Sequence, residues 1–145
     1  MLVHRNQKQK EIKMYRLLIT GSRTWSDEAS IEIWLRKVDF AHKEVTLVSG
    51  SCPRGADAIC EKVARRLGWV VERHPANWKP DGVHVDYNQG FVRNKEMVDM
   101  GADACLAFMV PDSRGTANTV GHAIRAGIPT TLVGASPFFA TFKPE

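Results

Sequence analysis

The chain has 145 residues, of which 43% are hydrophobic and 25% are charged, with a formal net charge of +4. This length and composition are typical of a single soluble globular domain with a core of its own. No apolar run approaches the roughly 20 residues of a membrane-spanning helix, and no signal-peptide pattern opens the chain, so we expect a cytoplasmic protein without membrane contacts.

Most of the net positive charge lies in the first 14 residues. This segment has four Lys or Arg residues and one Glu, so it carries +3 and the remaining 131 residues carry +1. A short basic end is typical of a solvated, disordered tail. We therefore predict a disordered tail at 1–14, one domain at 15–134, and a C-terminal tail at 135–145 whose phenylalanines pack against the domain or an oligomer partner.

The three cysteines do not indicate a disulfide framework or a metal site. Cys52, Cys60 and Cys105 are an odd number, and none belongs to a CxxC pair or a Cys/His set with zinc-ligand spacing. We therefore expect free thiols in a reducing compartment, with no metal and no resident cofactor.

Strands and helices are predicted to alternate along the chain. Short apolar runs predict five strands, at 15–20, 44–49, 69–74, 104–110 and 129–134. Helical spacing predicts four helices, one capped by Thr24 or Ser26 and ending near His42, and others at 55–67, 91–100 and 116–127. The strands are apolar runs without period-two alternation, as in a parallel sheet that helices cover on both faces. The predicted fold class is therefore α/β, a Rossmann-like three-layer sandwich with a mainly parallel sheet of about five strands.

The turns at the carboxyl ends of the strands are the candidate site, because ligands of such sheets bind there. Three of these turns are small and contain glycine, at 21–23, 49–57 and 111–118. Glycine lets the backbone approach an oxygen closely, Ser and Thr add hydroxyl donors, and a helix N-terminus attracts an anion. One such turn is also what any tight connection needs, but three at one sheet edge predict a cradle for the phosphates of a nucleotide. The chain has neither the GxGxxG motif of common NAD-binding folds nor the GxxxxGK[ST] motif of P-loop proteins, so neither of these two assignments is supported.

Several side chains near these turns have two interpretations. Arg93 and Asn94, which follow the long loop 75–89, suit a phosphate or are ordinary surface groups. Asp57 either complements the helix dipole or accepts hydrogen bonds from a ribose, and Trp78 either packs or stacks on a base, which the loop is expected to recognise. The candidate ligand-binding residues are Gly21, Ser22, Arg23, Gly50, Ser51, Arg54, Gly55, Asp57, Trp78, Arg93, Asn94, Ser113, Gly115, Thr116 and Asn118.

Five segments together resemble the SLOG superfamily, which is named for the Smf/DprA and Lonely Guy proteins. They are RLLITGSRTW, VSGSCPRGADAICEKVARRLGW, HPANW, GFVRNKEMV and DSRGTANTVGHAIRAGIP. The resemblance covers about residues 15–134 and is greatest to the branch related to YspA and cpYpsA, small Rossmann-like proteins of bacteria and phages. It implies a site for a nucleotide-derived small molecule at the strand ends.

Lonely Guy enzymes of this superfamily cleave the N-glycosidic bond of nucleoside 5′-monophosphates and are commonly dimers or larger, which implies a homo-oligomer here. Arg93 matches their helix arginine, and Gly115-Thr116 matches their phosphate-binding Gly-Thr. Their two loop glutamates are replaced by Asn118 and Thr119, which cannot supply negative charge to an oxocarbenium-like transition state. The loop is therefore predicted to hold a phosphate but to suit that reaction poorly.

Three functional hypotheses follow. The first is a sensor or sequestering module that binds ADP-ribose, NAD or a nucleoside phosphate. The second is a nucleotide N-glycosidase in which Asp57 or Asp112 replaces the glutamates and acts with Arg93. The third is binding of single-stranded DNA, because DprA proteins carry an Arg-Asn-Arg segment similar to residues 93–95; the charge of only +1 outside the tail disfavours it.

Overall fold

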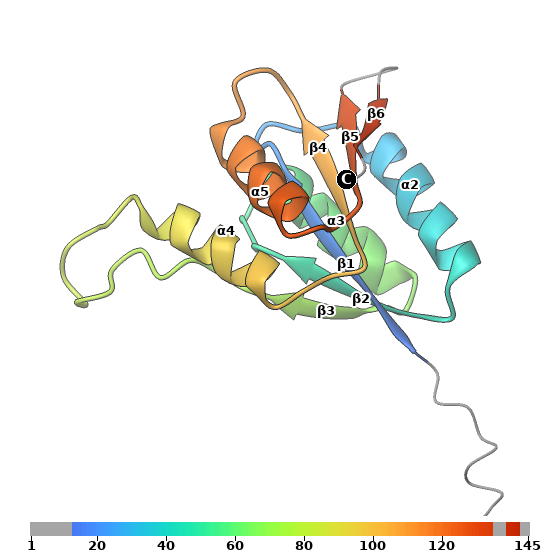
Figure 1. Ribbon diagram of the computed structural model, residues 1–145, viewed down its shortest axis with the longest axis horizontal. Helices are drawn as coiled ribbons and strands as arrows, with labels where there is room; N and C mark the ends of the chain where they lie inside the picture. The colour runs from blue at the N-terminus through green and yellow to red at the C-terminus, as the bar shows by residue number, and fades with distance from the viewer. Residues whose placement is uncertain (1–12, 135–138, 143–145) are drawn as a thin grey trace, which may run out of the picture.

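The computed structural model describes residues 13–134 and 139–142, which form a six-stranded sheet with helices on both faces (Figure 1). The strands lie in the order β3-β2-β1-β4-β5-β6; the first five are parallel, and β6 is antiparallel to β5. Their bounds are β1 Met14–Gly21, β2 Glu44–Ser49, β3 Val70–Arg73, β4 Ala104–Met109, β5 Thr130–Gly134 and β6 Phe139–Phe142.

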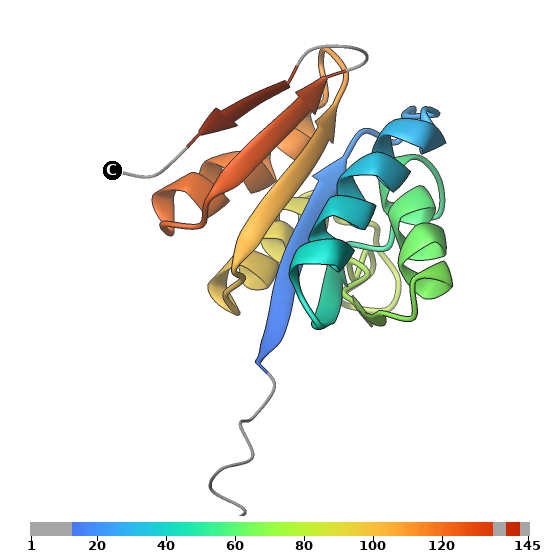
Figure 2. The ribbon, with the colours of Figure 1, turned by 90° about the vertical axis from the view of Figure 1, so that its right-hand side faces the viewer.

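The helices pack in two pairs. On one face of the sheet lie α2 (Glu28–Ala41) and α3 (Ala56–Arg66), and on the other lie α4 (Gln89–Asp99) and α5 (Arg114–Arg125) (Figure 2). None of the helices in the described part of the chain is long and apolar enough to cross a membrane. The prediction of a Rossmann-like α/β sandwich with a mainly parallel sheet is confirmed.

The central strand β1 contributes to both hydrophobic layers. Leu17 and Ile19 are buried in the cluster beneath α2 and α3, whereas Leu18 belongs to the cluster that includes Met97 of α4 and Ala123 of α5. Successive side chains of a strand point to opposite faces, so the part of a strand that is covered on both sides is apolar at successive positions. This is why Leu17, Leu18 and Ile19 form a continuous apolar run, whereas Arg16, nearer the start of β1, pairs with Glu72 of β3.

Some predicted boundaries differ from the observed ones. The cap of α2 is Asp27, whose carboxylate accepts a hydrogen bond from the Ser30 N–H at 3.1 Å, and not Thr24 or Ser26. An ionised carboxylate is a stronger acceptor than a hydroxyl, which explains the later start. Helices α4 and α5 each begin two residues before the predicted position.

The strand β6 was not predicted, because the segment has no clear period in sequence. It is held by backbone pairing with β5 at the edge of the sheet, and such pairing depends little on a side-chain pattern. The remainder of the predicted tails, residues 1–12, 135–138 and 143–145, lies outside the described residues.

The strand order places β1 beside β4 at the point where the winding of the sheet reverses, which is where open α/β sheets bind ligands. At this point the turn after β1 contacts both β4 and the N-terminus of α3. The Ser22 N–H donates to the Phe108 carbonyl oxygen at 2.9 Å, and the Ala56 N–H donates to the Ser22 carbonyl oxygen at 3.0 Å. The turns after β1 and β2 are therefore joined through their backbones.

Two glycines make this close approach possible. A Cβ on Gly21 would overlap the Ala56 Cβ and the Phe108 carbonyl oxygen, and a Cβ on Gly55 would overlap the backbone of the turn after β1. Gly55 also has a φ of +79°, which residues with side chains rarely adopt. Both positions therefore require glycine.

We predict that Gly55→Ala destabilises the fold much more than the matched change Gly68→Ala. The two glycines have almost the same φ, +79° and +80°, but a Cβ on Gly68 meets no atom within 4 Å. Gly55 also has a ψ of −148°, a combination that essentially only glycine adopts. A backbone outside the usual regions costs about 1–3 kcal/mol, and overlap with backbone should raise the loss for Gly55→Ala to about 3 kcal/mol or more. Urea unfolding measures both losses, and equal values would contradict the close approach.

Candidate functional site

A cavity of about 490 Å³ opens at the carboxyl ends of β1 and β4. The turn after β1, helix α4, the turn after β4 and the first residues of α5 line it. Its volume lies within the range of small-ligand sites, roughly 300–1,000 Å³. We call this cavity the first compartment.

A second compartment of about 520 Å³ adjoins the first. The turn after β2 and the loop between β3 and α4 contribute most of its lining. Six residues line both compartments, which therefore form one cleft: Arg23, Gly50, Cys52, Trp78, Tyr87 and Arg93.

Most of the candidate residues from the sequence line this cleft. The first compartment takes Gly21, Ser22, Arg23, Gly50, Asp57, Trp78, Arg93, Asn94, Ser113, Gly115 and Thr116. The second adds Ser51 and Arg54, whereas Gly55 and Asn118 line neither. The cleft also includes residues that the sequence analysis did not select as ligand-binding, among them Thr24, Cys52, Tyr87, Phe91, Asp112 and Arg114.

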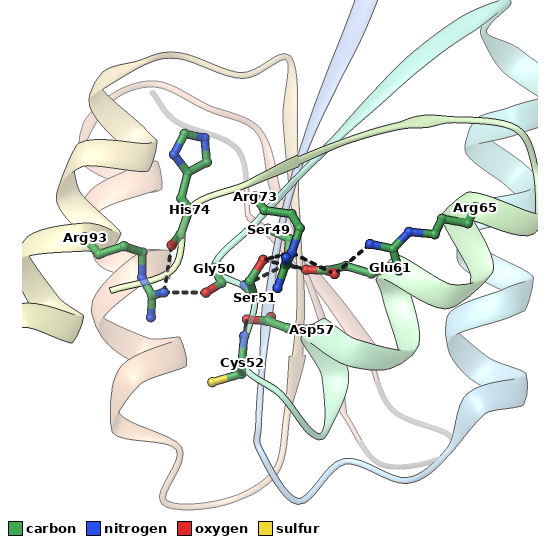
Figure 3. A network of polar contacts seen from close by, with 10 residues as sticks. All are labelled: Ser49, Gly50, Ser51, Cys52, Asp57, Glu61, Arg65, Arg73, His74 and Arg93. Atoms are coloured by element: carbon green, nitrogen blue, oxygen red, sulfur yellow. Dashed lines mark hydrogen bonds and ion pairs between the residues drawn. The ribbon is translucent and has the colours of Figure 1, made fainter. Parts of the chain in front are cut away.

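Arg93 reaches from α4 to the ends of β2 and β3 (Figure 3). Its Nη1 donates to the carbonyl oxygens of Gly50, at 2.5 Å, and His74, at 3.0 Å, and its Nε donates to Asn94 Oδ1 at 2.9 Å. Burial lowers the pKa of Arg93, but a guanidinium keeps its proton in proteins. Its Nη2 has no hydrogen-bond partner among the described residues, so Arg93 both joins two strand ends and keeps a donor for a ligand.

Asp57 is a buried carboxylate in the first turn of α3, and its residue is only 7% exposed. Its Oδ2 accepts a hydrogen bond from the Cys52 N–H at 3.1 Å. Burial raises the pKa of Asp57 to about 6, while the Cys52 N–H and the charges of Arg93 and Arg23 limit the rise. At neutral pH this carboxylate is mostly ionised but close enough to its pKa to exchange a proton.

Glu61, one turn further along α3, fixes the turn after β2 (Figure 3). It is 6% exposed and accepts hydrogen bonds from the hydroxyls of Ser49, at 2.8 Å, and Ser51, at 2.7 Å. Arg65 and Arg73 pair with it at 3.3 and 3.4 Å. The sequence analysis missed this role, because the carboxylate and its hydroxyl partners come from different elements.

The N-terminus of α5 has no side-chain cap, because the side chain of its N-cap residue, Ser113, accepts no hydrogen bond from the backbone of the helix. The Ser113 hydroxyl donates to Thr116 Oγ1 at 2.5 Å instead of accepting from a backbone N–H. Helices α3 and α4, whose first residues also line the cleft, likewise have no side-chain cap, whereas α2, whose first residues do not line it, has the carboxylate cap Asp27. Because residues 114–116 line the first compartment, their N–H groups and the helix dipole can act on an anion there.

Asn94 and Asn118 connect α4 to α5. The buried Asn94 donates from Nδ2 to the Gly115 carbonyl oxygen, at 3.3 Å, and to Asn118 Oδ1, at 3.2 Å. Thr119 is fully buried and donates to the same Gly115 oxygen at 3.3 Å. The two positions that hold glutamates in Lonely Guy loops therefore have side chains that support α5 and do not line the cleft.

The arginines of the cleft have no carboxylate partner among the described residues. Elsewhere, five arginines pair with glutamates at 2.7–3.4 Å: Arg16, Arg36, Arg65, Arg66 and Arg73. The cleft is lined by four others, which make no such pair: Arg23, Arg54, Arg93 and Arg114. Guanidinium groups that make no ion pair of this kind, beside an uncapped helix N-terminus, favour an anionic ligand.

Comparison with known proteins identifies the family of this chain. The model of the YspA, cpYpsA-related SLOG family matches residues 15–80. The Gene 61 protein of Mycobacterium phage D29 is 39% identical over 132 residues, which cover 86% of this chain and 100% of that protein. The chain belongs to the YspA, cpYpsA-related SLOG family. Membership in this SLOG family indicates a nucleotide-related function.

The match to the SLOG family model covers one side of the cleft. It runs from β1 to the start of the loop after β3, and includes Gly21, Asp57 and Trp78. Helices α4 and α5, with Arg93 and Thr116, lie outside the matched residues.

We predict that Asp57→Asn changes how the stability of this SLOG protein depends on pH. The pKa of Asp57 in the folded protein, about 6, lies above its ordinary value of 3.8, so wild-type stability should fall as the pH rises between these values. A difference of about two pKa units corresponds to about 2–3 kcal/mol. The variant cannot titrate but keeps an oxygen for the Cys52 N–H, so relative to wild type it should gain about 2–3 kcal/mol between pH 4 and pH 7.5.

Urea unfolding at the two pH values measures this difference. If the variant differs from wild type by the same free energy at both pH values, Asp57 does not have a raised pKa in the folded protein.

Proposed function

We propose that this protein binds a nucleotide-derived anion of the ADP-ribose, NAD or nucleoside-phosphate class and acts as a sensor or sequestering module. The observation that carries the proposal is that three arginines line the first compartment beside the uncapped N-terminus of α5 without an ion pair to a carboxylate of the described residues: Arg23, Arg93 and Arg114. Membership in the SLOG family supports a nucleotide-related ligand.

A phosphoryl group would bind at the start of α5. The N–H groups of Gly115 and Thr116 would donate to its oxygens, and Arg93 and Arg114 would pair with its charge. Gly115 has no atom within 4 Å of the place where a Cβ would be, so a phosphate oxygen has room to approach the backbone.

The nucleoside would lie along the rest of the first compartment. Asp57 would accept hydrogen bonds from ribose hydroxyls, and its burial would strengthen them. Trp78 and Tyr87 would stack on the base, and Tyr87, which is 81% exposed, would lose water contact on binding. Gly55 and Asn118 would act indirectly, by holding the turn after β1 and helix α5 in place.

We predict that Arg93→Ala and Thr116→Ala each weaken binding of AMP, ADP-ribose or NAD by about ten- to a hundredfold. The first removes the guanidinium, and the second removes a hydroxyl that accepts from Ser113 and would donate its own hydrogen to the phosphate. Isothermal titration calorimetry measures the affinities. The matched control is Arg125→Ala, which removes a positive charge at the other end of α5 and should leave binding unchanged.

Thermal unfolding of each variant accompanies these titrations, because Arg93 also holds the backbone at Gly50 and His74. If all three variants bind as the wild type does, or if none of the three nucleotides binds the wild type, the proposed function is wrong. The expected homo-oligomer stays a separate prediction, which sedimentation analysis tests.

A second candidate function is hydrolysis of an N-glycosidic bond, which the buried Asp57 favours. Its raised pKa and its place in the lining of the first compartment are typical of a group that handles protons. In this function Asp57 would activate water or stabilise the developing positive charge of the sugar, and Arg93 would hold the phosphate. The glutamates of the Lonely Guy loop would then be replaced by a carboxylate from α3.

For this second function we predict release of free base from AMP, NAD or ADP-ribose, and its loss in Asp57→Asn. Chromatography of the reaction mixture measures the base, and calorimetry measures whether the variant still binds. If prolonged incubation gives no free base, the protein does not hydrolyse these nucleotides, and the first proposal, a binding module, stands. Product formation that survives Asp57→Asn would exclude Asp57 as the reacting carboxylate.

A further inference from the structure

We propose that the second compartment binds a second phosphoryl group of the same ligand, so that the ligand class is a nucleotide with two or more phosphoryl groups and not a simple monophosphate. This inference rests on the proposed function, in which the first phosphate binds at α5. It assigns a role to a part of the cleft that the first phosphate and its ribose do not use.

The charge of the second compartment carries the argument. Three arginines line it, Arg23, Arg54 and Arg93, and none of its lining residues is Asp or Glu. Arg93 interacts with the charges of both Arg23 and Asp57, so the carboxylate in reach of these arginines belongs to the first compartment, and an anion in the second would offset the positive charge there. The first compartment differs, because Asp57 and Asp112 are part of its lining.

Arg54 is the residue that distinguishes the two compartments. It lines only the second one, on the exposed turn before α3, and makes no hydrogen bond, ion pair or ring contact among the described residues. Arg73, close to the same turn, is instead paired with Glu61 at 3.4 Å and bonded to Ser51 at 3.0 Å. The neighbouring carboxylate is therefore already engaged, and Arg54 remains for a ligand.

The shared wall allows one ligand to reach both compartments. Arg23 and Arg93 lie on this wall, where they can pair with phosphates that cross from one compartment to the other. Trp78 lies on the same wall, with its ring 6.0 Å from the Arg23 guanidinium carbon. The ligand would thus pass between the compartments beside Arg23 and Arg93, and its second phosphoryl group would pair with Arg54.

Two ligand chemistries fit this path. In a nucleoside 3′,5′-bisphosphate the second phosphoryl group is attached to the ribose, and in a nucleoside triphosphate it continues the phosphate chain. We therefore use AMP, adenosine 3′,5′-bisphosphate and ATP as probes, in metal-free buffer at one fixed ionic strength, with wild type, Arg54→Ala and the control Arg125→Ala.

We expect at least one of the two longer probes to bind wild type tenfold or more tightly than AMP does, as a further charge-assisted contact would produce. Arg54→Ala should abolish this gain and leave the affinity for AMP unchanged, while Arg125→Ala should keep the gain. Whichever probe gains affinity identifies the attachment of the second group.

The outcomes separate this inference from the proposed function. If AMP binds and neither longer probe gains, or if the gain survives Arg54→Ala, the second compartment is not a phosphate subsite and the proposed function still stands. If none of these probes binds, this inference is wrong, and the proposed function is wrong as well when ADP-ribose and NAD also fail to bind.

Discussion

The site depends on the backbone contact between the turn after β1 and the N-terminus of α3. Gly21 and Gly55 allow this contact because neither position has space for a Cβ. In this contact the carbonyl oxygen of Ser22 accepts a hydrogen bond from the Ala56 N–H. The contact thereby places the buried Asp57, the next residue in the chain, in the lining of the first compartment. Without the contact, the turns after β1 and β2 would not share one cleft.

The polar side chains in and next to the cleft divide into two groups. One group is bonded within the protein and sets positions: Glu61 holds the turn after β2, and Asn94 holds α5. The other group, Arg23, Arg54 and Arg114, makes no ion pair with the described residues. Arg93 belongs to both groups, since it binds two carbonyl oxygens and still has a nitrogen without a partner. A rigid frame that holds cations without ion pairs is suited to selective binding of an anion.

Asp57 shows the energetic cost of such a site. A carboxylate that is buried beside Glu61 is less stable in its charged form than it would be in water, which is the reason for its raised pKa. Functional sites commonly contain groups that lower the stability of the fold. Arg93 and Arg23 reduce this cost, and an anionic ligand that competes for these arginines would change the protonation of Asp57.

The sequence predicted the fold and the strand-end turns because both depend on local patterns. Apolar runs specify strands, and turns such as Gly21-Ser22-Arg23 show where the backbone must bend. The partners of Glu61 and Asn94 could not be predicted, because they come from other elements and depend on tertiary packing. Asn118 illustrates the difference: its position in the loop suggested ligand contact, yet its carboxamide bonds to Asn94. Tyr87 was within reach of prediction, as an aromatic residue in the loop 75–89.

The most direct test of the central claim is a titration of ¹⁵N-labelled protein with AMP and with ADP-ribose, followed by the backbone amide signals in NMR spectra. Binding at the start of α5 predicts that the signals of Gly115 and Thr116 shift most, with those of the turns after β1 and β2, while Ser30 at the carboxylate-capped start of α2 is unaffected. No shift at Gly115 and Thr116, or equal shifts at both helix starts, would contradict an anion site built from the three strand-end turns.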